Sequence, residues 1–189
     1  MGKFVKALGT GMLTLVVMSS MVFAQEDGGE KEFKYVGAKK CMPCHMSPAK
    51  GAQFKHWQGT AHANAYKTLG TDAAKEAAPE GIENPQEADE CLKCHVTAYE
   101  EPDSLKIDKY NMTDGVTCES CHGPGSDYWK MPVMKGIAEG KMDPAEYGLE
   151  IPDNETCVEC HNENSPTFKG FDYEEMYKKI AHPNPQKTE

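Results

Sequence analysis

The sequence predicts an irregular, mostly α-helical domain, and three observations support this fold class. Two segments, 48–70 and 171–182, carry apolar residues at helical spacing. No segment shows the alternation of apolar and polar residues that is typical of a β-strand. The chain after residue 24 is also poor in leucine, isoleucine and valine for its length. It must therefore bury something other than its own side chains.

The first predicted helix has Ser47 as its N-cap and Pro48 in its first turn, and it ends near Gly70. Its apolar stripe consists of Phe54, Trp57, Ala61, Ala65 and Leu69. His62 lies at the edge of this stripe and is predicted to face the buried group. His56 lies about 120° away around the helix, so the two histidines cannot bind the same ion: they serve different ones, or His56 is a surface histidine.

The second predicted helix, 171–182, starts near Asp172 and is closed by Pro183. In an ideal helix His182 falls off the apolar stripe, but a last turn is often distorted, and we expect His182 to be a ligand. Elsewhere the sequence predicts a short helix over 71–78 and polar loops over 79–90 and 99–114. The segment 131–155 is expected to contain at most one or two helical turns.

The N-terminus has the features of a cleaved export signal, predicted over 1–24. Lys3 and Lys6 form a basic start, an apolar stretch follows, and Val22 and Ala24 fit the small-residue positions of a cleavage site. The apolar run is too short and too interrupted for a membrane span. We therefore expect a single exported domain, 25–189, in the periplasm or outside the cell, and not an integral membrane protein.

The exported chain is strongly acidic. Removing Lys3 and Lys6 takes the formal net charge from −10 to −12, and the sequence contains no arginine. This charge argues against nucleic acid as a partner, because phosphate backbones attract clustered positive charge. It suits a protein that docks onto the basic surfaces of protein partners.

All eight cysteines fall in four pentads of the pattern C-x-x-C-H. The first to fourth pentads are CMPCH (41–45), CLKCH (91–95), CESCH (118–122) and CVECH (157–161). In this pattern the cysteines attach a haem c and the histidine binds its iron. Disulfides, a thioredoxin-like dithiol and zinc sites do not require a histidine after every second cysteine. The sequence therefore predicts four haem c groups, which supply the missing core.

The histidine count limits how these irons are ligated. The predicted attachment residues are Cys41, Cys44, Cys91, Cys94, Cys118, Cys121, Cys157 and Cys160, and the predicted proximal ligands are His45, His95, His122 and His161. Only His56, His62 and His182 remain for the four distal positions. At most three haems are therefore bis-histidine within one chain. At least one has an open position, a methionine, or a ligand from a neighbouring molecule.

The chain resembles the tetrahaem cytochrome c-554 family of electron carriers over about 36–182. The resemblance is carried by KKCMPCH, WQGTAHANAYKTL, ECLKCHV, GVTCESCHGPG and TCVECHNENSPTFKGFDYEEM. It implies that His62 is the distal ligand of the third haem, opposite His122. It implies likewise that His182 is the distal ligand of the fourth haem, opposite His161.

The second haem, at His95, is five-coordinate by the same resemblance, and Ser165–Phe168 is similar in permuted order to the stretch that lines its open side. The first haem, at His45, is where this chain departs from the family. The family's distal histidine follows the C-H-G-P-G segment, where this chain has Met131 and Met134 and no histidine.

Three alternatives remain for the first haem. His56 supplies its distal imidazole, or a methionine thioether binds and raises its reduction potential, or His56 reaches a haem in an adjacent molecule. The ordinary explanation of Met131 and Met134 is that they only pack against the porphyrin.

The expected function is to carry electrons one at a time between redox proteins. The alternatives are reduction of nitric oxide, nitrite or hydroxylamine at an open haem, and a subunit of a conductive filament that shares a histidine ligand between molecules. The chain is accordingly expected to be either a monomer or part of such a filament.

Overall fold

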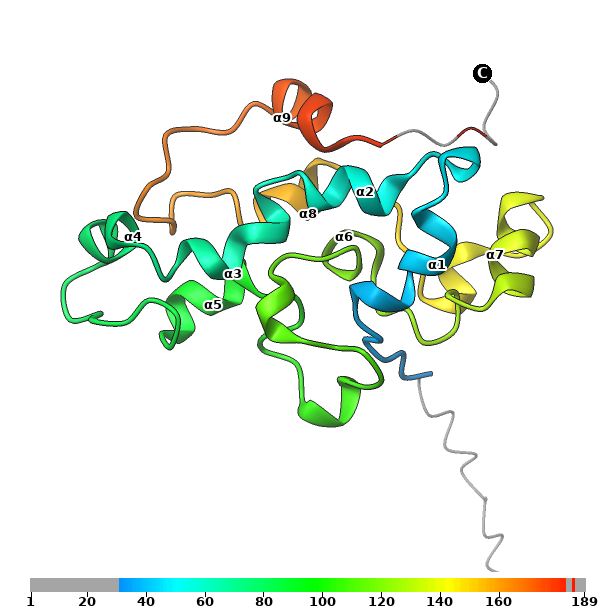
Figure 1. Ribbon diagram of the computed structural model, residues 1–189, viewed down its shortest axis with the longest axis horizontal. Coiled ribbons are helices and arrows are strands. Elements are labelled where there is room, and N and C mark those ends of the chain that lie inside the picture. Colours follow the sequence, from blue (N-terminus) through cyan, green and yellow to red (C-terminus); the bar gives the residue numbers. More distant parts are fainter. Residues whose placement is uncertain (1–30, 183–184, 186–189) are drawn as a thin grey trace, which may run out of the picture. The chain divides into compact units, whose positions relative to one another are not determined.

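The computed structural model describes residues 31–182 and residue 185, and the export signal predicted over 1–24 lies outside these residues. From Glu32 onward the chain forms one compact unit. Within the described part every regular element is a helix, and extended backbone pairs only in an isolated parallel bridge between Tyr35 and Lys106 (Figure 1). The prediction of an irregular, mostly α-helical chain is confirmed.

The helices are short, and irregular segments join them. The α-helices are α1 (Met42–His45), α2 (Gln53–Gln58), α3 (Ala65–Thr68), α4 (Asp72–Ala77), α5 (Asp89–His95), α6 (Glu119–His122), α7 (Met131–Ala138), α8 (Asn154–Val158) and α9 (Tyr173–Ile180). The 3-10 helices are η1 (Ala38–Lys40), η2 (Pro48–Lys50), η3 (His62–Asn64), η4 (Asp103–Leu105), η5 (Met112–Asp114) and η6 (Pro144–Tyr147).

The prediction of a single helix over 48–70 is wrong. The structure divides it into η2, α2, η3 and α3. Gly51 and Ala52 have φ values of 100° and 50°, and such left-handed residues interrupt the i to i−4 hydrogen-bond ladder. Ser47 precedes η2, but its side chain makes no capping hydrogen bond. In α2, which follows the break, Trp57 Nε1 donates to the carbonyl of Val116 at 2.9 Å.

The other helix predictions differ from the structure mainly at their ends. The predicted helix 171–182 is α9, which the Asp172 carboxylate caps by accepting from the Glu175 amide at 2.9 Å. The predicted helix 71–78 is α4, with Thr71 as its N-cap. The segment 131–155 is more helical than predicted, because η6 and the start of α8 follow α7. Short 3-10 turns also interrupt the predicted loop 99–114.

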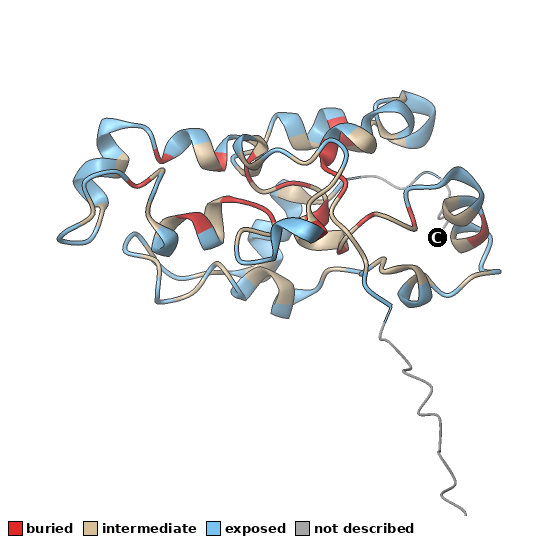
Figure 2. Ribbon diagram, turned by 90° about the horizontal axis from the view of Figure 1, so that it is seen from below, coloured by how far each residue is buried: buried red, intermediate tan, exposed pale blue. Residues whose placement is uncertain are grey.

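Few of the chain's own side chains are buried. Leu69, Leu92 and Val96 form a small cluster between α3 and α5, with Tyr66 and Met112 packed against it. Figure 2 shows that most of the described ribbon is of intermediate or exposed burial. This small core agrees with the sequence argument that the chain does not fill its interior with aliphatic residues.

A buried polar network joins the end of α5 to the start of α6. The Thr97 hydroxyl accepts from the amide of Thr117 at 2.8 Å and lies 2.7 Å from the Ser120 hydroxyl. The Tyr110 hydroxyl donates to the carbonyl of Thr97 at 2.8 Å. Because buried polar groups must be satisfied, this network fixes the second pentad against the third.

Gly37, just before η1, should tolerate no side chain. Its φ is 83°, and a Cβ there would lie 2.2 Å from the carbonyl oxygen of Lys109. Gly81 has a similar φ of 92° and open space around the Cβ position, so Gly81→Ala is a matched control. A positive φ costs an L-residue about 1–2 kcal/mol. We expect Gly81→Ala to lose that much stability in chemical denaturation and Gly37→Ala to lose clearly more. Equal losses would contradict the steric argument.

Candidate functional site

Each of the four pentads contains a single helical turn. The histidine is the last residue of α1, α5 and α6, and His161 follows α8. In three pentads the histidine amide donates to the carbonyl of the first cysteine, at 3.1 Å for His45, 2.9 Å for His122 and 3.0 Å for His161. One helical turn places residues i and i+3 side by side. Both cysteines of a pentad can therefore reach one edge of a flat group.

Three of the pentad histidines are oriented through Nδ1. The Nδ1 atom of His45 lies 3.2 Å from Gln53 Oε1, that of His95 lies 2.9 Å from the carbonyl oxygen of Ala65, and that of His122 lies 3.1 Å from the carbonyl oxygen of Glu150. A proton on Nδ1 leaves the Nε2 lone pair free for a metal ion. This is the arrangement expected of an imidazole that binds haem iron.

The pentads lie close to one another. The Cys41 thiol lies beside that of Cys118, and this neighbour raises the pKa of Cys41. Cys94 of the second pentad lies beside Cys160 of the fourth, and burial together with this neighbour raises the pKa of Cys160.

The third and fourth pentads are also neighbours. Burial raises the pKa of Cys121 to about 11, and the nearby Cys157 adds to the shift. The cysteine contacts therefore link the first pentad to the third, the third to the fourth and the fourth to the second, and the Thr97 network also holds the second against the third.

Two of the three remaining histidines lie near pentad histidines. The ring centroids of His62 and His161 are 5.9 Å apart, and those of His182 and His122 are also 5.9 Å apart. This pairing is the reverse of the one that the resemblance implies, in which His62 faces His122 and His182 faces His161. His56 lies beside His182, with 6.5 Å between the ring centroids.

These separations suit two imidazoles on opposite sides of one metal ion. A metal–imidazole bond is about 2.0 Å long, which places two opposed ring centroids roughly 6 Å apart. Burial lowers the pKa values of His62 and His122, which favours the neutral form that binds metals. Within residues 31–182, no ring contact joins His95 to another histidine.

The two methionines after the third pentad lie on α7. Lys40 Nζ lies 4.1 Å above the centroid of the Trp129 ring, so the chain entering α7 contacts the residue before Cys41. Met131 is 73% exposed, whereas Met134 is partly buried. Of the two, Met134 is therefore better placed to meet a buried group.

Two comparisons with known proteins bear on these pentads. A family model described as cytochrome c554 and c-prime matches residues 40–123. The cytochrome c-554 of Nitrosomonas europaea is 34% identical over 150 residues, which are 72% of this chain and 61% of that protein. The chain belongs to the cytochrome c-554 family. No solved structure matches it.

Membership of the cytochrome c-554 family implies that the bound group is haem c. The chain spans 61% of the length of its relative from Nitrosomonas europaea. Across residues 31–182 and 185, no helix is both long enough and apolar enough to cross a membrane.

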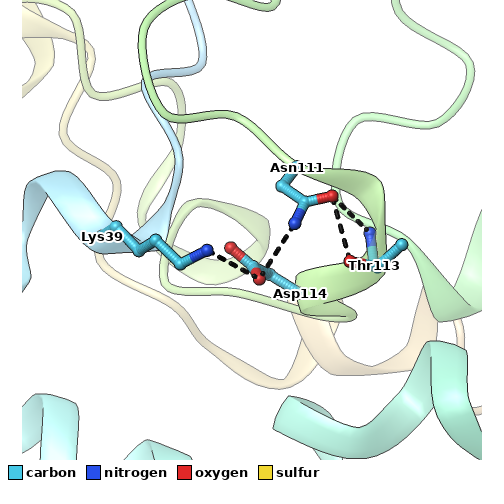
Figure 3. Close-up of polar contacts among 4 residues, drawn as sticks. All are labelled: Lys39, Asn111, Thr113 and Asp114. Atoms are coloured by element: carbon cyan, nitrogen blue, oxygen red, sulfur yellow. Dashed lines mark hydrogen bonds and ion pairs between the residues drawn. The ribbon is translucent and has the colours of Figure 1, made fainter.

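The backbone of His62 is held by the segment before the third pentad. The amide of Val116 donates to the carbonyl of His62 at 3.1 Å. The polar cluster of Figure 3 anchors this segment: Asp114 pairs with Lys39 of η1 at 3.7 Å, and the Asn111 side chain accepts from the amide of Thr113 at 3.2 Å. Contacts between distant parts of the sequence thus set the position of His62.

Sequence reasoning missed two residues of this site. Gln53 orients His45, and Glu119, inside the third pentad, is only 2% exposed. A glutamate between the two cysteines of a pentad was a visible signal, but its burial depends on chain segments that the motif does not contain. Ser165–Phe168 forms a turn in which the Phe168 amide donates to Ser165 at 3.0 Å, and its role beside His95 stays a prediction.

Proposed function

We propose that this member of the cytochrome c-554 family carries four haem c groups and passes electrons one at a time between redox partners outside the cytoplasm. The contact between cysteines of different pentads carries this proposal. Each haem iron supplies a one-electron ferric/ferrous couple. The cysteines hold the porphyrin edges, and the contacts between pentads bring the attached groups close together, with the third pentad next to the first. The segment 1–24 serves as the cleaved export signal.

The axial ligands follow from the histidine pairs. In this proposal His62 and His161 bind the fourth haem, and His182 and His122 bind the third. His95 is the only protein ligand of the second haem iron, which leaves one axial position of that iron open.

The first haem receives its distal ligand from α7 in this proposal. Gln53, at the start of α2, lies at Nδ1 of His45, so α2 is on the side of the imidazole that points away from the iron. His56 lies one turn after Gln53, on the same face of α2, and its ring lies next to His182 instead. Met134 is partly buried, and α7 follows the segment that contacts Lys40. We therefore assign the distal position to Met134 and none to His56.

Two single substitutions separate these candidates. We expect His56→Ala to leave the low-spin ferric signals in electron paramagnetic resonance unchanged. Met134→Ala should replace one low-spin signal with a high-spin signal and lower the potential of one haem, because a thioether ligand raises the potential. Met131→Ala is the matched control and should behave as wild type. A lost low-spin signal in His56→Ala would instead assign that histidine to an iron.

The proposed partners present basic surfaces. The formal net charge of the full chain is −10, and complementary charge mainly accelerates encounter. We expect electron exchange with such a partner to slow as ionic strength rises, since salt screens exposed charges.

The decisive test of the proposed function is made on the purified holoprotein. Mass spectrometry and haem absorbance should give four haems per chain, and a redox titration should reduce and reoxidise all of them reversibly. Sedimentation should show a monomer, and nitric oxide, nitrite or hydroxylamine should not be turned over. Fewer haems or irreversible reduction would refute the carrier. Turnover would favour a reductase, and ligand-sharing polymers a filament.

A further inference from the structure

Glu119 is the one charged side chain that is buried among the described residues, with 2% of its surface exposed. Its Oε1 atom accepts from the amides of Val36 at 2.8 Å and Gly125 at 2.7 Å. Its Oε2 atom accepts from the amide of Gly37 at 2.7 Å. The carboxylate therefore ties the chain before the first pentad to the chain around the third.

These contacts favour the ionised carboxylate. All three partners are N–H donors, and a protonated carboxyl would need an acceptor for its own proton. Burial raises the pKa of Glu119, and the three hydrogen bonds act in the opposite direction. No lysine or histidine within residues 31–182 forms an ion pair with it. The negative charge is balanced only by backbone dipoles.

The charge lies between the attachment points of two haems. Glu119 directly follows Cys118, and the Cys118 thiol contacts that of Cys41. The field of the carboxylate reaches this whole region. After burial, it is the largest contributor to the raised pKa of Tyr128, and it also contributes at Cys41. Charges in a poorly solvated interior are screened much less than exposed ones.

We propose that Glu119 is a fixed negative charge that lowers the reduction potentials of the first and third haems. The inference rests on the proposed function, because it needs haems at Cys41 and Cys118. Reduction adds one electron to an iron and removes one positive charge from it. A neighbouring anion therefore favours the ferric form, as expected for a potential set by local charge and burial. Cys118 adjoins Glu119 in the chain and Cys41 lies beside Cys118, so the haems at these two cysteines should feel this charge most.

The test is a spectroelectrochemical titration of Glu119→Gln in the holoprotein. We expect the equilibrium constant for reduction of at least one of the four couples to rise about tenfold, a positive shift of about 59 mV for a one-electron couple. Glu119→Ala is a second neutral variant, in which water can enter and satisfy the three amides. Glu119→Asp keeps the charge and should keep the potentials even where stability falls.

Glu159→Gln is the matched control, since Glu159 lies inside the fourth pentad but is exposed to solvent. Glu159→Gln should leave the reduction potentials of all four couples unchanged. Unchanged potentials in a neutral Glu119 variant that holds four haems would overturn the inference, and so would an equal shift in Glu119→Asp. Either result would leave the proposed function standing, because that is decided by haem count and reversible reduction of the wild type.

Discussion

Replacing Cys118 and Cys121 with alanine should produce a protein with three haems in which the first haem no longer exchanges electrons with the other two. The third pentad lies between the first and the fourth, as the contacts of Cys41 with Cys118 and of Cys121 with Cys157 show. Its loss removes the connecting haem. Mass spectrometry should report three haems. Rapid-mixing reduction should show the first haem being reduced at its own rate, separately from the second and fourth haems.

The matched control replaces Cys91 and Cys94 of the second pentad, which has no cysteine contact with the first. This variant should also hold three haems, but all of them should remain in fast exchange. The connecting role of the third pentad would be wrong if both variants behaved alike.

Replacing His62 with alanine should convert the fourth haem from low spin to high spin. Its imidazole lies 5.9 Å from that of His161, between ring centroids, and no other described histidine is in ring contact with His161. A new high-spin ferric signal and an iron that binds added ligands are the expected observations. His182→Ala should have the same effect on the third haem.

The two assignments can be separated by deleting one haem at a time. In a background that lacks Cys157 and Cys160, we expect His62→Ala to create no new high-spin signal, because the haem it would expose is absent. In the background that lacks Cys118 and Cys121 the signal should appear. The opposite pattern would restore the pairing that the family resemblance implies.

Local features of the fold were predictable from the sequence. The Thr71 and Asp172 caps and the apolar stripe of 171–182 involve neighbouring residues, so α4 and α9 could be anticipated. The break at Gly51 and Ala52 could not. Its left-handed backbone accompanies contacts with distant residues, among them the hydrogen bond from Trp57 to Val116, which no stripe of apolar residues encodes.

The candidate site likewise has features that could be predicted from the sequence and features that could not. Each pentad is one helical turn whose cysteines and histidine adjoin in the chain, so the attachment chemistry could be predicted residue by residue. Glu119 is buried because Val36 and Gly37, more than 80 residues away in sequence, bring their amides to it. A motif of five residues contains no information about such partners.

By itself, the sequence determined the four pentads, the shortage of one histidine, the helical class and the family. Only the tertiary structure decided which pentads are neighbours, which histidine rings lie close together, and that one carboxylate is buried between two of the pentads. The physical reason is the range of the interactions. Hydrogen bonds within one turn depend on residues that adjoin in the chain. The pairing of His62 with His161 depends on how loops between short helices bring distant segments together.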